Sequence, residues 1–453
     1  MTTKVRAVPA SKGSSGPLGL LAEFQTDPLG LLGRLHREHG DIARGRFLWV
    51  DNLFVFRPEY VKRVLLDNNK NYRKDPFTTG ILRFFGQDNL FTGDGDFWLR
   101  QRRLMQPMFH RQRITGFGKT MAEGAADMLD GWERRRAANP GEVFWLNDEM
   151  MQVTMRIVGQ ALFSEDLSAE ASRLGQAFND ADHYISFRFK NPAWQTWFPG
   201  RRNAGARIAR DTVVTRIREM IARRRLSGER RDDLLSMLIE ARDEDTGAGL
   251  DDEQIRREAG VMIAAGHETT AAALTWAFYL LATHPKQEAR LQAEIAAVLG
   301  RRAATIDDVS ALTYTRQVID ETLRLYPPAW ATARQAIGED ALGPFHVPAG
   351  MNINIPIHAI HHSPVYWERP EDFEPERFAP ERTERQERFS YLPFGGGPRQ
   401  CIGNMFALTE ATLILAAVIQ RYQLRAVSGH AVRPEPVLTL NTSAGLPVTL
   451  QPR

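Results

Sequence analysis

From about Pro58 to Leu312, apolar residues recur every three or four positions, which places them on one face of an α-helix. The longest such stretch runs from about Asp251 to Thr283, and His284-Pro285 ends it because proline lacks an amide hydrogen. The pattern therefore predicts a mainly helical chain. Further helices expected from it are Pro58–Asn68, Gly95–Met108, Met121–Ala138, Asp148–Leu162 and Ala204–Arg225.

Strand-like alternation is confined to short segments. Met351–Ile357 alternates in residue type, and its Pro356 marks either an edge strand or a strand end. Two hairpins are expected. The first pairs Asp41–Arg46 with Leu53–Phe56, and the second pairs the VLTL and PVTL segments on either side of Gly445.

The chain shows no internal repeat, no long low-complexity stretch and no linker that would divide its 453 residues into independent halves. We therefore expect an N-terminal arm and lead-in over residues 1–30, followed by one domain over residues 31–453. The expected fold class is mainly α with a small β-rich region.

Charge and hydropathy argue against two classes of partner. The formal net charge is +3, which is too small an excess to indicate nucleic-acid binding. The most apolar long stretch, Val261–Ala282, carries Gly266, His267 and Glu268 near its middle, and such groups are costly in lipid. The N-terminus has no apolar core of signal-peptide length. We therefore expect a soluble, cytoplasmic protein without a membrane anchor.

The chain holds a single cysteine, Cys401, which rules out an internal disulfide framework and fits a reducing compartment. It lies in the segment YLPFGGGPRQCIGNMFALTE, residues 391–410, where consecutive glycines and a proline set a tight backbone. A helical pattern starts directly after it. The sulfur is expected at a helix N-terminus, where the helix dipole and the amides of Ile402 and Gly403 would stabilise a thiolate.

This loop has the spacing Phe394-x-x-Gly397-x-Arg399-x-Cys401-x-Gly403 and resembles the haem-binding loop of the cytochrome P450 family at every position of that pattern. The resemblance implies heme b, iron protoporphyrin IX, with Cys401 as the axial iron ligand. Phe394 could shield the sulfur from water, and Arg399 could pair with a haem propionate. The resemblance also implies the cytochrome P450 fold, with the haem between the long central helix and the helix after Cys401. The alternative is a glycine-rich turn with a buried thiol.

Residues 264–270, AAGHETT, lie in the long central helix and satisfy the family's pattern for the oxygen-handling segment. Ala265 and Thr269 are four residues apart and share a face, as do Gly266 and Thr270. Small side chains there would leave space over a flat cofactor. The Thr269 hydroxyl could bond a carbonyl one turn back and open the helix locally.

Glu268 and Thr269 together offer a carboxylate and a hydroxyl that could deliver the protons needed when O₂ is reduced at a dry site. The resemblance supports this role, because relatives that use peroxide often lack the threonine. His267, a lone histidine in the helix, is expected to point away from the haem. The alternative for the segment is an ordinary core helix with a satisfied threonine.

Glu321 and Arg324 are three residues apart on one helix face, and Arg377 belongs to the PERF segment at residues 375–378. In the cytochrome P450 family, a Glu-x-x-Arg pair and a later arginine form a buried ion network behind the haem. The resemblance therefore implies that these three residues hold the fold and contact no substrate.

Trp98 and Arg102 resemble the family's Trp-x-x-x-Arg and share a helix face, from which each could donate to a propionate. Arg334 lies where relatives place another propionate arginine. The alternative for each is a surface salt bridge, which would contribute little.

The motifs together imply an O₂-dependent haem-thiolate monooxygenase that hydroxylates or epoxidises an apolar substrate such as a fatty acid, a terpene or a steroid. An aromatic-rich pocket is expected, although aromatic residues could also simply pack the core. The expected lining comes from Phe77–Asn89, Phe178–Phe198, Val261–Thr269, Ala329–Ala333 and Ser443–Leu446, and its aromatic residues are Phe77, Phe84, Phe85, Phe187, Trp194, Trp197 and Trp330.

Electrons are expected from a separate partner, because only residues 402–453 follow the cysteine. Basic residues on or just after the Trp98 helix would suit an acidic ferredoxin or flavodoxin, itself served by a reductase, although a solvated helix face explains them nearly as well. These residues are Arg100, Arg103, Arg111 and Arg113. We expect the protein to be a monomer.

Two other functions remain open at this point. One is a peroxide-driven or isomerising haem-thiolate enzyme, against which Glu268 and Thr269 speak. The other is a non-catalytic haem binder, such as a sensor or an electron carrier, for which a pocket and a proton relay would have no use.

Overall fold

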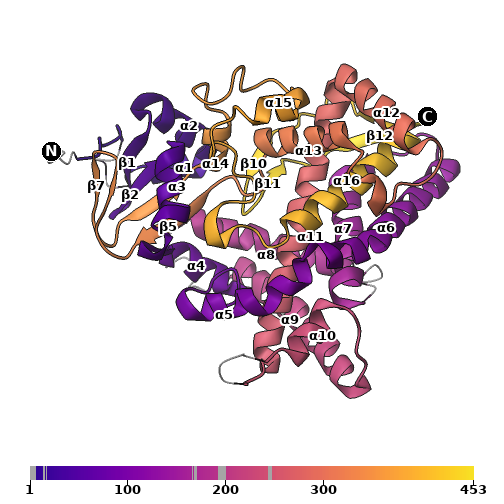
Figure 1. The fold of residues 1–453 in the computed structure, drawn as a ribbon, viewed down its shortest axis with the longest axis horizontal. Helices are drawn as coiled ribbons and strands as arrows, with labels where there is room; N and C mark the ends of the chain where they lie inside the picture. Colours follow the sequence, from indigo (N-terminus) through magenta and orange to yellow (C-terminus); the bar gives the residue numbers. More distant parts are fainter. Residues whose placement is uncertain are drawn as a thin grey trace.

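The computed structural model describes residues 7–453, except residues 14, 15, 17, 166, 168–170, 192–199 and 243–246. The largest sheet lies at one side of the molecule, near the N-terminus, and long helices make up most of the opposite side, with small sheets among them (Figure 1). The chain is thus mainly α with a smaller β-rich region, as the sequence pattern predicts.

The long central helix α11 (Asp252–Thr283) begins at a capping box. Asp251 Oδ1 accepts from the Gln254 amide at 2.7 Å, and Gln254 Oε1 accepts from the Asp251 amide at 3.2 Å. The helix ends at His284, and Pro285 opens α12. The other long helices are α2 (Pro28–His39), α5 (Gly95–Met105), α6 (Arg111–Ala138), α7 (Leu146–Phe163), α8 (Ala171–Lys190), α9 (Arg201–Ser227), α12 (Pro285–Leu299), α13 (Thr313–Leu325) and α16 (Asn404–Arg421).

Short helices connect these elements. The helix predicted at Pro58–Asn68 is α-helical as far as Lys62 and continues as a wider π-helical turn over Arg63–Asp67. The short α-helices are α1 (Leu21–Thr26), α3 (Pro58–Lys62), α4 (Pro76–Leu82), α10 (Leu234–Glu240), α14 (Ile357–His361) and α15 (Pro380–Thr383).

A five-stranded sheet joins segments from both ends of the chain in the order β1-β2-β8-β5-β3. Its strands are β1 (Ile42–Phe47), β2 (Val50–Val55), β3 (Tyr72–Lys74), β5 (Thr332–Ala336) and β8 (Asn352–Ile355). β1 and β2 form the predicted antiparallel hairpin, β2 and β8 are parallel, and the remaining pairs are antiparallel. Pro356 directly follows β8, which lies in the middle of the sheet, so the proline marks a strand end and not an edge.

The predicted pairing of VLTL with PVTL is wrong. The C-terminal hairpin instead pairs β10 (Pro434–Pro436) with β11 (Leu440–Thr442). The following strand, β12 (Pro447–Pro452), lies between β9 (Tyr422–Ala426) and β4 (Phe144–Trp145). Ala444 and Gly445 both have positive φ and turn the chain away from β11. Two similar apolar segments could pair locally, but β12 buries its apolar side chains better against distant strands. A further hairpin pairs β6 (Asp340–Leu342) with β7 (Phe345–Val347).

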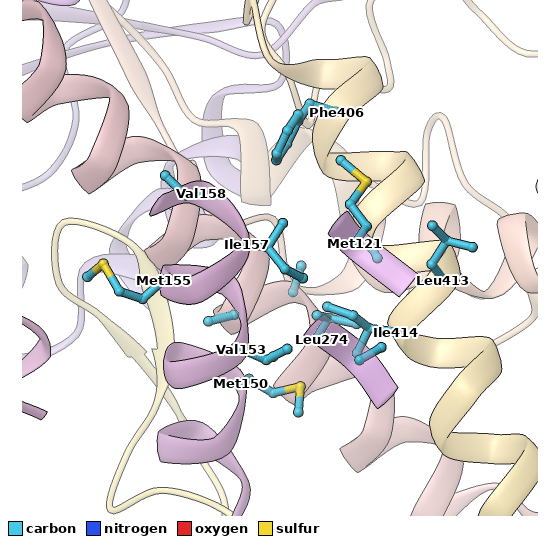
Figure 2. Packing of buried hydrophobic residues seen from close by; sticks show 14 of the residues in the cluster. Met121, Met150, Val153, Met155, Ile157, Val158, Leu274, Phe406, Leu413 and Ile414 are labelled. Atoms are coloured by element: carbon cyan, nitrogen blue, oxygen red, sulfur yellow. The ribbon is translucent and has the colours of Figure 1, made fainter. Parts of the chain in front are cut away.

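The main core lies where α7, α11 and α16 meet. Figure 2 shows side chains of α7 and α16 pointing toward one another, with Leu274 of α11 between the two helices. Ile157 of α7, Leu274, and Phe406 and Ile414 of α16 are all at most 4% exposed. Burying one such side chain contributes about 1.5–3 kcal/mol. This packing fixes the helix that follows Cys401 against the helix that carries residues 264–270.

Within the described part of the chain, the helices are either too short or too polar to cross a lipid bilayer.

Candidate active site

Cys401 lies at the end of a tight glycine loop, three residues before α16 begins. Its amide donates to the Phe394 carbonyl at 3.0 Å and closes the loop. Gly395 and Gly397 have φ of +67° and +70°, and a side chain at Gly397 would overlap the Leu65 carbonyl oxygen. The loop therefore packs tightly against the π-helical turn at Arg63–Asp67. The Cys401 side chain remains exposed.

The sulfur is exposed, yet enough protein surrounds it to change its acidity. Burial raises the pKa of the Cys401 thiol, whereas the Gly403 amide and the Arg102 guanidinium lower it in part. Arg102, on α5, donates from Nη1 to the Gln400 carbonyl at 2.9 Å, so it lies against the cysteine loop. Both groups favour the thiolate, as the position before a helix N-terminus predicts.

Arg399 is held by Asp94 and by the Gly93 carbonyl, to which its Nη1 donates at 3.0 Å. Its guanidinium carbon lies 4.3 Å from the centre of the Trp98 ring, a cation–π contact. Trp98, Arg102 and Arg399 therefore meet between α5 and the cysteine loop.

Two further cations lie beside Arg399. Lys74 of β3 stands directly opposite Arg334 of β5 in the sheet. Burial and, to a smaller extent, the positive charge of Arg399 lower the pKa of Arg334 to about 10. Burial lowers the pKa of Lys74 well below its ordinary value. The positive charges of Arg334 and Arg399 lower it further. The carboxylate that partly offsets these charges is Asp94, which also accepts from the Lys74 amide at 2.8 Å. Three enclosed cations with one carboxylate make a site that favours a further anion.

The open side of α11 carries Ala265, which is exposed, and Thr269, which is half-buried. Thr269 Oγ1 donates to the Ala265 carbonyl at 2.7 Å, the bond one turn back that its position predicts. Gly266 lies on another side, where a Cβ would come within 3.0 Å of Val158 Cγ2, so this glycine lets α11 approach α7 closely. Thr270 donates to the Gly266 carbonyl at 3.2 Å and is buried.

His267 lies on the packed side of α11. Its Nδ1 lies 2.6 Å from the Ile263 carbonyl, and its ring centre lies 5.0 Å from that of Phe178 on α8. Burial lowers the pKa of His267 to about 4, so the ring is neutral near pH 7. It therefore faces away from Ala265 and Thr269.

Glu268 is held by residues from the C-terminal hairpin. Thr439 Oγ1 donates to Glu268 Oε1 at 2.6 Å, and Asn441 Nδ2 donates to Thr439 Oγ1 at 3.0 Å. Burial raises the pKa of Glu268, and the two hairpin side chains lower it in part. The sequence pattern does not reveal Thr439 and Asn441, because only the packing of the hairpin brings them to α11.

The predicted ion network is present and fully buried. Arg324 donates from Nε and Nη2 to the two carboxylate oxygens of Glu321 at 2.7 and 2.8 Å. Arg377 Nε donates to Glu321 Oε1 at 3.3 Å. His361 connects this network to the cysteine loop, since its Nδ1 lies 3.1 Å from the Arg324 carbonyl and its Nε2 accepts from the Leu392 amide at 2.8 Å. The sequence pattern gives no signal for this contact.

A family model described as Cytochrome P450 matches residues 16–447. The chain belongs to the cytochrome P450 family. Two similar relatives come from Streptomyces melanosporofaciens: cyclooctatin synthase, 34% identical, and cyclooctat-9-en-7-ol 5-monooxygenase, 35% identical, each covering 92% of this chain and 89% of the relative. A third, LUTEIN DEFICIENT 5, chloroplastic, from Arabidopsis thaliana, is 32% identical over 98% of this chain and 77% of its own length.

A solved structure of the cytochrome P450DA heme domain has the same fold. Its TM-score with this chain is 0.89 at 24% sequence identity, over 99% of this chain and 98% of that one. The predicted fold and the predicted enzyme class are therefore confirmed: this cytochrome P450 is an oxidoreductase that carries heme b.

The residues of this cytochrome P450 fit that cofactor. The exposed Cys401 sulfur offers a thiolate ligand, and the crowded cations Lys74, Arg334 and Arg399 suit the two carboxylates of a haem. Lys74 and Asp94 belong to this arrangement, although the sequence analysis missed them. An isolated lysine at the end of a short strand gives no signal until β3 is paired with β5.

Glu410 of α16 is a second buried group that the sequence analysis missed. It is 0% exposed, and the Thr270 hydroxyl of α11 lies next to its carboxyl. Burial raises the pKa of Glu410 well above the ordinary value, and the Thr270 hydroxyl lowers it in part. Glu410 connects the helix after Cys401 to the oxygen-handling helix.

Of the aromatic residues predicted to line a pocket, Phe84 contacts Tyr184 of α8, with ring centres 5.1 Å apart. Phe77 is 59% exposed. Trp330 instead packs beside the five-stranded sheet and donates to the Val437 carbonyl at 3.0 Å. Trp194, Trp197 and the side chain of Phe85 lie outside the described residues.

Proposed function

We propose that this cytochrome P450 is an O₂-dependent monooxygenase that inserts one oxygen atom into an apolar organic substrate, with electrons from a separate protein. The proposal rests on two consecutive residues of α11: Thr269, whose hydroxyl lies on the open side of the helix, and Glu268, whose carboxyl is enclosed. Reduction of O₂ consumes protons, so a hydroxyl and an acid side by side serve that reaction. Peroxide-driven chemistry has less need of them.

Residues around the cofactor have separate tasks in this proposal. Bound through Cys401, heme b supplies the activation of O₂ and the reaction with substrate. The amides of Ile402 and Gly403 would stabilise the thiolate, as the Gly403 amide does in part in this structure, and Phe394 would shield the haem-bound sulfur from water. The propionate-binding residues are Trp98, Arg102, Arg334 and Arg399, to which the structure adds Lys74.

The proton-handling residues act at defined atoms. The Thr269 hydroxyl hydrogen is committed to the Ala265 carbonyl, so its oxygen lone pairs remain to accept from a water and orient it. Burial raises the pKa of Glu268, so this side chain holds a proton at higher pH than an exposed glutamate does. Glu268 can therefore donate a proton to the water that Thr269 orients.

The proposed substrate is uncharged and mainly hydrocarbon. The relative at 35% identity is named for the 5-monooxygenation of cyclooctat-9-en-7-ol, a name that denotes an unsaturated alcohol. Among the candidate classes of fatty acid, terpene and steroid, a terpene-like alcohol or alkene suits this relationship best. The aromatic contact of Phe84 with Tyr184 of α8 agrees with an apolar pocket wall.

The proposed electron donor is a ferredoxin or a flavodoxin with its reductase. Arg103 and Arg111 are exposed on and just after α5, the helix whose Arg102 lies against the cysteine loop. An acidic partner would be attracted to this side of the molecule, and mutation of such rim charges changes mainly the association rate.

The test measures how much product Thr269→Ala forms per electron pair consumed, and how much peroxide it releases in the same assay. We expect the variant to bind substrate normally but to divert most electrons to peroxide. Thr275→Ala is the matched control, because Thr275 makes the same bond one turn back, to Ala271 at 2.8 Å, within the packed part of α11. Equal coupling in wild type and Thr269→Ala would contradict the relay and favour peroxide-driven chemistry.

A further inference from the structure

Glu258 of α11 is a buried acid that bonds a distant part of the backbone. Its Oε2 accepts from the Leu90 amide at 2.9 Å, across 168 positions of the chain. Glu258 is 1% exposed and Leu90 is 8% exposed, so water has little access to either partner. An amide buried without an acceptor is costly, and this bond therefore ties α11 to the segment around Leu90.

Leu90 belongs to a tight turn over Asn89–Asp94. The Asn89 side chain, which is 7% exposed, accepts from the amides two and three positions later, at 2.9 and 3.0 Å. The Asn89 carbonyl accepts from the Gly93 amide at 2.7 Å. These local bonds hold the turn together as one unit, so a shift at Leu90 is transmitted to its far end.

The far end of this turn holds Arg399. The Gly93 carbonyl accepts from Arg399 Nη1 at 3.0 Å, and the Asp94 carboxylate pairs with the same guanidinium. Asp94 also accepts from the Lys74 amide at 2.8 Å and caps the N-terminus of α5. The turn thus lies between the start of α11 and the cations that suit the haem carboxylates.

The segment before the turn also packs against α11. Gly86 has φ of +144°, and a Cβ at this position would lie 2.6 Å from Arg256 Nη2. Arg256 is itself held by Glu253, whose carboxylate oxygens accept from its Nε at 2.9 and 3.0 Å. Because the chain meets α11 at Gly86 and again at Leu90, the start of α11 is a fixed support for the turn.

We infer that Glu258 is a positioning residue for the haem: by anchoring the Asn89–Asp94 turn, it fixes the place of Arg399. Glu258 acts through the turn and needs no contact of its own with the cofactor. Haem binding alone is enough for this role, so it stands or fails independently of the proposed reaction with O₂.

The first experiment measures how fast the haem-loaded protein releases haem to an acceptor protein. Glu258→Leu removes the acceptor of the Leu90 amide and should release haem about fivefold faster. Glu258→Gln keeps an oxygen for that amide and should stay within about twofold of the wild-type rate. Asn89→Ala opens the turn from within and should reproduce the effect of Glu258→Leu, so it also provides the test if the leucine variant does not fold.

Thr275→Val is the matched control for the loss of a buried hydrogen bond on the same helix. Thr275 is 2% exposed and bonds the Ala271 carbonyl at 2.8 Å, within the packed part of α11 and away from the turn. This variant should release haem at the wild-type rate. Acceleration equal to that of Glu258→Leu would reduce the role of Glu258 to general stability and overturn the inference.

The second experiment asks whether the effect passes through Arg399. Arg399→Lys keeps a positive charge but cannot bridge Gly93 and Asp94 as a guanidinium does. In this background Glu258→Leu should accelerate haem release by about twofold or less, because the turn no longer holds residue 399. The same acceleration in both backgrounds, or wild-type release by both Glu258→Leu and Asn89→Ala, would overturn the inference.

Discussion

Lys74 and Arg334 stand directly opposite each other on the antiparallel strands β3 and β5, and protein encloses both side chains. Like charges in a cross-strand pair destabilise a sheet by roughly 0.2–1 kcal/mol. Arg399 adds a third positive charge, and Asp94 offsets only part of the total. The apoprotein therefore stores repulsion that the two propionates of heme b would relieve.

Replacing Lys74 separates cofactor binding from protein stability. Lys74→Met should release haem about 10–100-fold faster, because a charged hydrogen bond contributes about 1.5–3 kcal/mol. The same change should make the apoprotein slightly more stable, since it removes the repulsion with Arg334. Haem transfer to an acceptor protein and urea unfolding of the apoprotein measure the two effects. Arg73→Met is the control, because Arg73 bonds Gln335 on the exposed face of the same strands; equal effects in both variants would contradict the assignment.

Cys401→Ala tests the iron ligand. The wild type, reduced and bound to CO, should give the visible spectrum of thiolate ligation, and the variant should lose it because the chain has no other cysteine. Retention of that spectrum would contradict the assignment of Cys401 as the iron ligand.

Removing Arg324 should prevent accumulation of the folded, haem-loaded protein. Glu321, a fully buried charge, would then lose its two shorter ionic hydrogen bonds and keep, of its ion pairs, only the 3.3 Å contact with Arg377, at a cost of about 3–5 kcal/mol. Arg316→Ala provides the comparison on the same helix, because its partly exposed pair with Asp320 should contribute about 0–1 kcal/mol. Haem content per protein and unfolding midpoints report both. Normal haem content with slow turnover in Arg324→Ala would point to a catalytic role.

Glu258 should make stability fall as the pH rises. It is buried on α11 and accepts from the Leu90 amide at 2.9 Å, and burial raises its pKa from 4.5 to about 7. The folded protein therefore keeps a proton that the unfolded chain releases above pH 4.5, so its stabilising contribution is lost between pH 4.5 and about 7. Glu258→Gln should flatten this slope. Urea unfolding at pH 5 and pH 8 measures it, and parallel losses in both proteins would refute the assignment.

Glu410 should tolerate glutamine but not alanine. Glu410 is fully buried, and both of its carboxyl oxygens lack a hydrogen-bond partner among the described residues, so burial raises its pKa and favours the uncharged form. Glu410→Gln keeps a donor and should change the free energy of unfolding by about 1 kcal/mol or less. Glu410→Ala leaves a buried cavity and should cost about 2–5 kcal/mol. Calorimetry of both variants decides, and equal losses would show that the donor is irrelevant.

The sequence by itself determined the elements whose signals are local. Asp251 and Gln254 mark the start of α11 within four residues, and His284-Pro285 marks its end. The glycine loop before Cys401 and the Glu321–Arg324 pair are likewise read from neighbouring positions. These predictions hold because caps, turns and one-turn contacts depend on only a few consecutive residues.

Tertiary structure decided which distant segments meet. The same apolar pattern fits VLTL against PVTL, yet β12 pairs with β9 and β4, which bury it better. Lys74 becomes a neighbour of Arg334 only through the pairing of β3 with β5. Phe178 contacts His267 only because α8 packs near α11. The physical reason is that long-range partners are selected by burial and charge summed over the whole core, and a local pattern carries no record of that sum.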